Sequence, residues 1–178
     1  MAGGIEGLDK LMKKYGQLAE QITEATMEKA VGASAITVQK AAKDGCPSHD
    51  GELKQSILTS VQKTEEKVIG TIYTNKPYAG YVEMGTGPKG EANHSGISPL
   101  VSPAYTQEPW WIHESQIDRK TAETYQWHYI DTPDGRFYRC EGQAAQPYLY
   151  PALKNNKERV TRNISNYIAR EIRRICND

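Results

Sequence analysis

The apolar residues at the start of the chain recur three and four positions apart, a spacing that predicts an amphipathic helix over residues 5–43. The residues that carry this spacing are Ile5, Leu8, Leu11, Met12, Tyr15, Leu18 and Ile22, continued more weakly by Ala30, Val31, Ser34, Ala35 and Val38. A continuous helix of this length would measure about 58 Å, which exceeds the diameter of a compact domain of this size. We therefore expect either a break near Gly16 or Gly32, where glycine destabilises the helix, or an end that projects towards another molecule. Residues 44–47 (Asp-Gly-Cys-Pro) end the helix, because glycine caps it and proline cannot continue it.

Two runs of alternating side chains follow, over residues 56–62 and 68–73. A period of two is typical of a strand with one buried face. The polar residues 63–67 between the runs make a connection of hairpin length. The pattern predicts an antiparallel hairpin.

Aromatic residues concentrate in the middle of the chain. Residues 73–150 contain 9 of the 11 tyrosines, all 3 tryptophans and the single phenylalanine. Prolines interrupt residues 85–135 repeatedly, so no long regular element is expected there. We interpret residues 88–141 as an extended, aromatic-rich loop insertion, and loops of that length usually have a function.

The last part of the chain predicts a strand over 136–140, after an Asp134–Gly135 turn, and a helix over about 148–175. The helix has one apolar stripe, formed by Leu153, Val160, Ile164, Tyr167, Ile168, Ile172 and Ile175. We expect an α+β fold in which a long N-terminal helix and a C-terminal helix pack on a small antiparallel β-sheet. The length favours a single domain over residues 1–178, with the insertion inside it.

The composition is polar and its charge is balanced. The 22 basic and 22 acidic residues cancel, so no overall field favours nucleic acid or anionic lipid. No apolar run reaches the roughly 18 residues of a membrane span, and the first residues lack a signal pattern, so we expect neither secretion nor membrane insertion. Three widely spaced cysteines, Cys46, Cys140 and Cys176, favour reduced thiols over a disulfide framework.

Side chains capable of catalysis or metal binding form no recognised motif. The histidines are His49, His94, His113 and His128. His113-Glu114 resembles the start of a zinc-protease helix, but position 117 is isoleucine instead of a second histidine. The glycine-rich residues 85–90 lack the spacing of a phosphate-binding loop and favour a sharp turn. We therefore predict no catalytic residue, no metal site and no cofactor.

The predicted C-terminal helix is basic, which raises the question of DNA binding. Its cations are Lys154, Lys157, Arg159, Arg162, Arg170, Arg173 and Arg174. They are suited to neutralising phosphates, but basic groups near a helix C-terminus also interact favourably with the helix dipole. We favour a solvated helix face and keep DNA binding as an alternative.

Three motifs in order give the chain a family resemblance. Residues 46–57 (CPSHDGELKQSI) are similar to a P-x-D-T-G-x-L-x-x-S-I pattern, residues 78–87 (YAGYVEMGTG) to a YAxYVExGTG box, and residues 146–153 (QPYLYPAL) to a QPFLxPAL box. The chain departs from these patterns at His49, Asp50 and Tyr148. With the GLDKL opening at residues 7–11, it resembles the tail-completion, or neck-to-tail joining, proteins of long-tailed bacteriophages, a siphophage tail-component family.

The resemblance implies a structural virion protein with no catalytic residues. It implies a ring of six copies at the head–tail junction, assembled in the cytoplasm of the bacterial host. The partners that it implies are the tail tube or tail terminator protein on one side and the head-connector or stopper protein on the other. We expect at most weak contact with the exiting DNA and none with a membrane.

We expect the interface with other subunits or partners to use the second motif, a tryptophan pair and the start of the third motif. The residues are Tyr78, Tyr81, Glu83, Gly85, Thr86, Gly87, Trp110, Trp111, Gln146 and Pro147. The turn over residues 83–87 is assigned a packing role first, and Trp110 and Trp111 are candidate anchors, because tryptophan is enriched at interface hot spots. The alternatives are a DNA-binding accessory protein that uses the basic helix, and a metal-dependent hydrolase.

Overall fold

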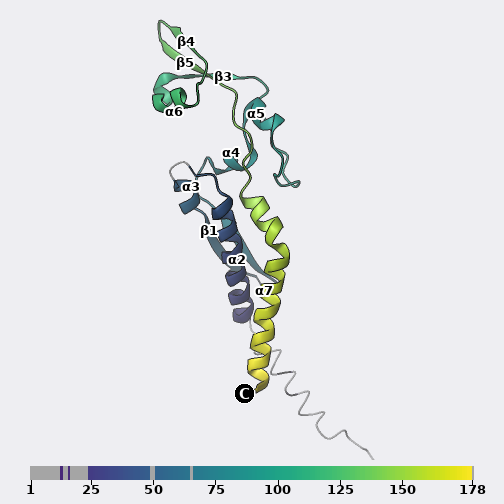
Figure 1. Ribbon diagram of the computed structural model, residues 1–178. Helices are drawn as coiled ribbons and strands as arrows, with labels where there is room; N and C mark the ends of the chain where they lie inside the picture. The colour runs from purple at the N-terminus through teal and green to yellow at the C-terminus, as the bar shows by residue number, and fades with distance from the viewer. Residues whose placement is uncertain (1–12, 14–15, 17–23, 49–50, 65, 178) are drawn as a thin grey trace, which may run out of the picture. The chain divides into compact units, whose positions relative to one another are not determined.

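The computed structural model describes residues 13, 16, 24–48, 51–64 and 66–177 (Figure 1). The chain divides into two compact units: unit 1, within Met1–Asn75 and Ala152–Asp178, and unit 2, Lys76–Pro151. The fold is α+β, as predicted, with long helices and small antiparallel sheets. The assignment of residues 1–178 to a single domain, with 88–141 as an insertion, stays a prediction.

Unit 1 combines helices with a two-stranded antiparallel hairpin. Its described elements are α2 (Glu24–Gly45), α3 (Glu52–Gln55), β1 (Leu58–Lys63), β2 (Val68–Tyr73) and most of α7 (Leu149–Asn177). The helix α2 packs against both strands of the hairpin (Figure 1). A Cβ atom at Gly70 of β2 would lie 2.9 Å from the Val31 Cγ1 atom of α2, so glycine at this position lets the hairpin approach the helix closely.

The helix α2 confirms the predicted end at residues 44–47 and excludes one predicted break. It ends at Gly45 and passes through Gly32 without interruption. A Cβ at Gly32 would lie 3.5 Å from Val61 of β1, so the helix packs closely on the hairpin at this glycine. The rest of the predicted 5–43 helix, with the segment around Gly16, lies outside the described residues apart from single positions.

The predicted hairpin is confirmed, but both ends of its first strand are shifted, from 56–62 to Leu58–Lys63. β2 has the predicted bounds, and Lys63 pairs with Val68 across the connection. The first strand begins at Leu58 instead of Ser56, because Ser56 ends the short helix α3 and its hydroxyl donates to the Leu53 carbonyl oxygen at 2.8 Å. Ile57, between helix and strand, is fully buried.

The predicted C-terminal helix is also confirmed, as α7 over Leu149–Asn177. It begins in unit 2 and continues through unit 1. Leu153, a member of the predicted apolar stripe, is 54 % exposed. Among the described helices, none has both the length and the apolar character needed to cross a membrane.

Unit 2 contains a second sheet that the sequence pattern did not predict. Its elements are α4 (Ala79–Met84), α5 (Gly87–Ala92), β3 (Trp110–His113), the 3₁₀ helix η1 (Glu114–Gln116), α6 (Arg119–Thr124), β4 (Tyr129–Thr132) and β5 (Gly135–Cys140). The strand order is β3-β5-β4, all antiparallel. The predicted strand 136–140 is therefore the centre of a sheet. The prolines bound the strands instead of preventing them, since Pro109 precedes β3 and Pro133 lies in the β4–β5 turn.

Candidate functional site

The second and third motifs, far apart in the sequence, are joined by backbone pairing within unit 2. The Thr86 N–H donates to the Gln143 carbonyl at 2.9 Å, and the Gln143 N–H donates back to the Thr86 carbonyl at 3.1 Å. The Gln143 side-chain amide donates to the Tyr81 carbonyl at 2.9 Å, and the Gln146 N–H donates to the Val82 carbonyl at 2.8 Å. This arrangement fixes the turn after α4 against the segment that leads into α7.

Glycine is required at the turn itself. Gly85 has φ 77° and ψ 174°, a conformation that only glycine adopts readily. A Cβ at Gly85 would lie 2.7 Å from the Ala145 backbone nitrogen, and one at Gly87 would lie 2.8 Å from the Trp110 ring. Because Gly85 and Gly87 have no side chain, the turn can lie close against neighbouring atoms of unit 2.

Glu83 caps the start of α7. Its Oε2 atom accepts the backbone N–H groups of Tyr148 at 2.7 Å and Leu149 at 2.9 Å, and its Oε1 atom accepts that of Tyr150 at 2.9 Å. The first N–H groups of a helix have no partner within the helix, and the helix dipole favours negative charge there. Both carboxylate oxygens are thus engaged by the backbone, in a contact between residues more than sixty positions apart.

Aromatic rings surround a groove beside this turn. The aromatic groove has a volume of about 670 Å³, and its ring-bearing lining residues are Tyr78, Tyr81, Tyr105 and Trp110. The Tyr105 hydroxyl donates to the Met84 carbonyl at 2.8 Å, and desolvation, with a smaller effect of the Glu91 carboxylate, raises the pKa of Tyr105. Tyr81 is 61 % exposed, so the groove presents aromatic surface to solvent.

The structure brings most of the predicted interface residues to this region, but separates the two tryptophans. Trp110 and Trp111 are neighbours on β3, so their side chains lie on opposite faces of the sheet. Trp110 lines the aromatic groove, whereas Trp111 pairs across the sheet with Arg139 and lies near the His128 ring, with 6.3 Å between ring centroids. Tyr105 also lines this groove and was not among the residues expected from the sequence, since its only signal there is an aromatic side chain in a proline-rich segment.

The described histidines have structural partners. The Nδ1 atom of His113 accepts the Ser115 N–H at 3.2 Å, which leaves Nε2 as the donor to the Asp134 carbonyl at 3.0 Å. The His94 ring stacks on Tyr105, with 5.7 Å between centroids. Within the part of the chain that the structure describes, no three histidine, cysteine or acidic side chains are placed to hold a metal ion.

An ion pair fixes the β4–β5 hairpin on the same sheet. The Arg136 Nε atom lies 2.8 Å from the Asp131 Oδ1 atom, and the guanidinium lies 3.8 Å from the centre of the Tyr129 ring. Hydrogen bonding to Arg136 lowers the pKa of Asp131. Arg136 and Asp131 thus form a cross-strand ion pair, and such pairs commonly stabilise antiparallel strands.

Aromatic residues are enriched in the cores of protein–protein interfaces, and aromatic rings line the groove described above. Residues 9–85, less than half of the 178-residue chain, match the family model described as "Bacteriophage HK97-gp10, putative tail-component". This match confirms the predicted resemblance to a siphophage tail-component family; it spans the first motif and most of the second, and the third lies outside it. No curated protein and no solved structure gave a significant match to the chain.

Proposed function

We propose that the protein is a structural, non-catalytic component of the phage neck that completes the tail and joins it to the head connector. The observation that carries the proposal is the family match over residues 9–85. The site geometry supports it, because the motif residues Glu83, Gly85 and Thr86 are engaged by the backbone and leave aromatic rings as the exposed chemistry.

The proposed mode of action is ring assembly. Copies of the chain, six in the complete ring, contact one another through two different surfaces whose rotation closes the ring. The ring docks the tail tube or tail terminator protein on one side and the head-connector or stopper protein on the other. The aromatic groove is the proposed anchor for one of these protein contacts, because buried tyrosine and tryptophan contribute strongly to interfaces.

Quantitative mass spectrometry of purified, DNA-filled particles tests this function. We expect a few copies of the chain per particle, close to six, and electron microscopy should place them at the head–tail junction. Particles that are complete, infectious and free of the chain would contradict a structural role in the virion.

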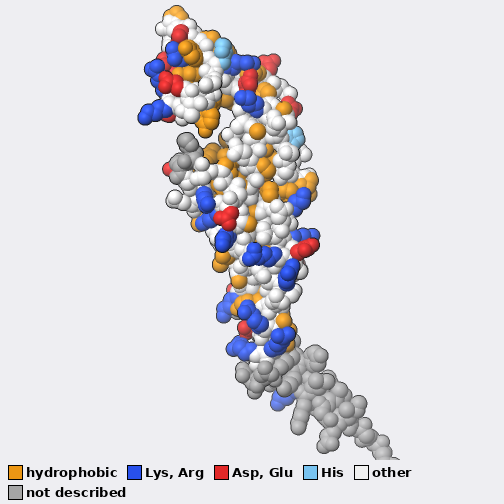
Figure 2. Space-filling view, viewed as in Figure 1, with side chains coloured by type: hydrophobic (Ala, Val, Ile, Leu, Met, Phe, Trp, Pro, Cys, Tyr) orange, Lys and Arg blue, Asp and Glu red, His pale blue; other side chains and the backbone are white. Residues whose placement is uncertain are grey.

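One observation favours DNA binding as a second candidate function. Arg159, Arg162, Arg170 and Arg173 are exposed along α7, and Figure 2 shows Lys and Arg side chains gathered over the region of α2 and α7. A DNA-binding accessory protein would have an affinity that falls steeply with salt concentration and is lost when these arginines are neutralised. In a neck protein the same face would make weak contact with the exiting DNA.

A further inference from the structure

A groove between two helices of unit 1 has an unusual lining. The helix groove, about 530 Å³ in volume, is lined on the α2 side by Ala30, Ala33 and Ser34, and on the α7 side by residues that include Asn166, Arg170 and Arg173. The α2 side therefore consists of small, mostly apolar side chains, whereas the α7 side carries polar and cationic side chains. Small residues on a helix let another segment approach its backbone closely.

Ser34 gives this groove a buried polar group that has no partner. Its side chain is 2 % exposed, and its hydroxyl has no hydrogen-bond partner among the described residues. A buried hydroxyl without a partner is costly, and native proteins usually satisfy such groups. Ser34 therefore places an unsatisfied buried hydroxyl in the lining of the helix groove.

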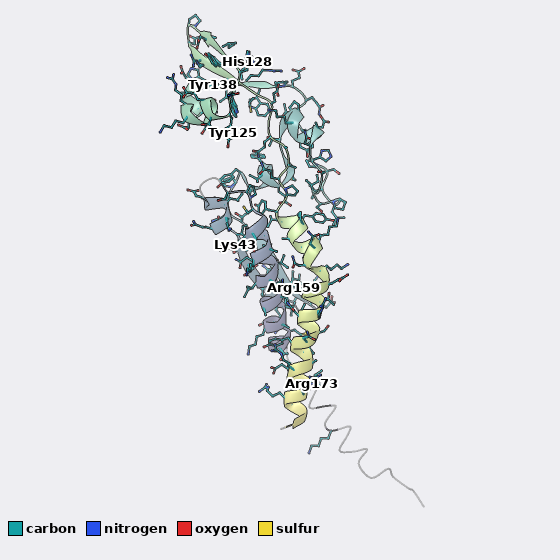
Figure 3. The ribbon with its side chains drawn as sticks, viewed as in Figure 1. Lys43, Tyr125, His128, Tyr138, Arg159 and Arg173 are labelled. Atoms are coloured by element: carbon teal, nitrogen blue, oxygen red, sulfur yellow. The ribbon has the colours of Figure 1, made fainter. Side chains whose placement is uncertain are left out.

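The two arginines that line the groove, Arg170 and Arg173, are exposed and carry positive charge. Among the described residues, no carboxylate forms an ion pair with Arg170 or Arg173, and Glu171 pairs with Arg174 at 2.9 Å. The Arg170 guanidinium lies 5.4 Å from the centre of the Tyr167 ring, and Arg173 lies on α7 towards its C-terminal end (Figure 3). Arginine is well suited to bind carboxylates through two parallel hydrogen bonds.

The two units of the chain carry opposite net charge. Unit 1 has 16 basic and 13 acidic residues, a net charge of +3, whereas unit 2 has 6 basic and 9 acidic residues, a net charge of −3. A ring needs contacts between two different surfaces of identical chains. Opposite charges on the two units meet this requirement and favour the correct pairing.

We propose that the helix groove receives an acidic segment of unit 2 from a second copy of the chain. Carboxylates of that segment bind Arg170 and Arg173, and a polar group of it hydrogen-bonds to the Ser34 hydroxyl. This inference rests on the proposed ring and names the surface that closes it.

The shape of the site favours a protein segment over DNA. Ser34 is almost entirely buried in the lining of a groove between two helices, and a single side chain of a peptide is narrow enough for such a site. The phosphates of a DNA duplex lie on the outside of a wide cylinder and would contact exposed cations such as Arg159 and Arg162 instead. A site built only for phosphates would need neither the small residues nor the buried hydroxyl.

Two double variants with the same change of charge test the groove. Arg170→Glu/Arg173→Glu reverses charge in the lining, and Arg159→Glu/Arg162→Glu reverses it elsewhere on α7. We expect the first to weaken self-association in sedimentation velocity by on the order of tenfold or more, and the second to weaken it much less. Ala33→Trp, which places bulk in the groove from an exposed position, should also weaken it, whereas Lys40→Trp, exposed elsewhere on α2, should not.

Cross-linking identifies the occupant. Arg170→Lys/Arg173→Lys keeps the charge and introduces amines that a zero-length carbodiimide reagent joins to carboxylates. In a mixture of isotopically light and heavy protein, we expect mixed-isotope peptides that link these lysines to acidic residues of 76–151. A wild-type chain that stays monomeric at high concentration, or cross-links that never join two copies, would overturn the inference.

The remaining outcomes separate this inference from the proposed function. Equal losses of DNA affinity in both double variants, with unchanged self-association, would overturn the inference and assign the arginines to DNA. Particles that contain the chain but assemble normally with the groove variants would also overturn it, and the proposed neck function would still stand. Absence of the chain from particles would count against the neck function alone.

Discussion

Gly85 is the residue at which the turn of the second motif depends most on glycine. Alanine there would force a side chain into a conformation suited to glycine and place its Cβ 2.7 Å from the Ala145 nitrogen. We expect Gly85→Ala to lower the free energy of unfolding by at least about 2 kcal/mol. All three tryptophans lie in unit 2, so urea unfolding followed by tryptophan fluorescence measures the effect.

Gly80 provides the matched control in the same motif. It lies within α4, and a Cβ there would meet only the end of the Met84 side chain, at 3.5 Å. Gly80→Ala should therefore leave stability unchanged or raise it by up to about 1 kcal/mol, because alanine favours the helix. Equal losses in both variants would show that the turn does not need glycine.

Residue types were easier to predict from the sequence than their surroundings. The motif glycines and the excess of aromatic residues were visible, because both are properties of single positions. The separation of Trp110 from Trp111 was not, because it depends on which face of β3 each side chain occupies. The partners of Glu83 were also hidden, since they lie more than sixty residues away along the chain.

At the scale of elements, α7 begins where Glu83 of the preceding motif can accept its first N–H groups. We expect Glu83→Gln to lower the free energy of unfolding by about 2 kcal/mol, because charge-assisted hydrogen bonds and a favourable dipole interaction are lost together. Far-UV circular dichroism and tryptophan fluorescence during urea unfolding measure the loss in α7 and in unit 2.

Glu158→Gln is the control for this cap. Glu158 is exposed within α7, away from the first turn, and its replacement should change stability by less than about 0.5 kcal/mol. If the two variants unfold at the same urea concentration, the carboxylate of Glu83 does not stabilise the start of the helix.

The long elements followed from the sequence, and the short ones did not. The C-terminal end of α2, the helix α7 and the β1–β2 hairpin were predicted, because each repeats its pattern over enough residues. The strands β3 and β4 have four residues each, too few to show an alternation. The proline content of the segment also suggested a loop, whereas two of its prolines lie beside strands.

At the scale of the whole molecule, the proposed assembly would depend on surfaces that folding leaves exposed. Tyr81 and Tyr125 are matched in exposure, since both lie in unit 2 and their exposed fractions are 61 % and 62 %. Tyr81 lines the aromatic groove, whereas Tyr125 follows α6 and lies outside that groove. Neither substitution by alanine should change stability by much, because each ring is largely in solvent.

The two tyrosine variants therefore separate assembly from folding. We expect Tyr81→Ala to fold with the wild-type melting temperature but to be incorporated into particles several-fold less, because the loss of an aromatic anchor costs at least about 1 kcal/mol at an interface. Tyr125→Ala should be incorporated normally. Quantitative mass spectrometry of particles made with each variant measures how much of each is incorporated. Equal incorporation of both variants would show that the aromatic groove does not bind a partner. A lowered melting temperature for Tyr81→Ala alone would instead show that the Tyr81 ring stabilises the packing of unit 2.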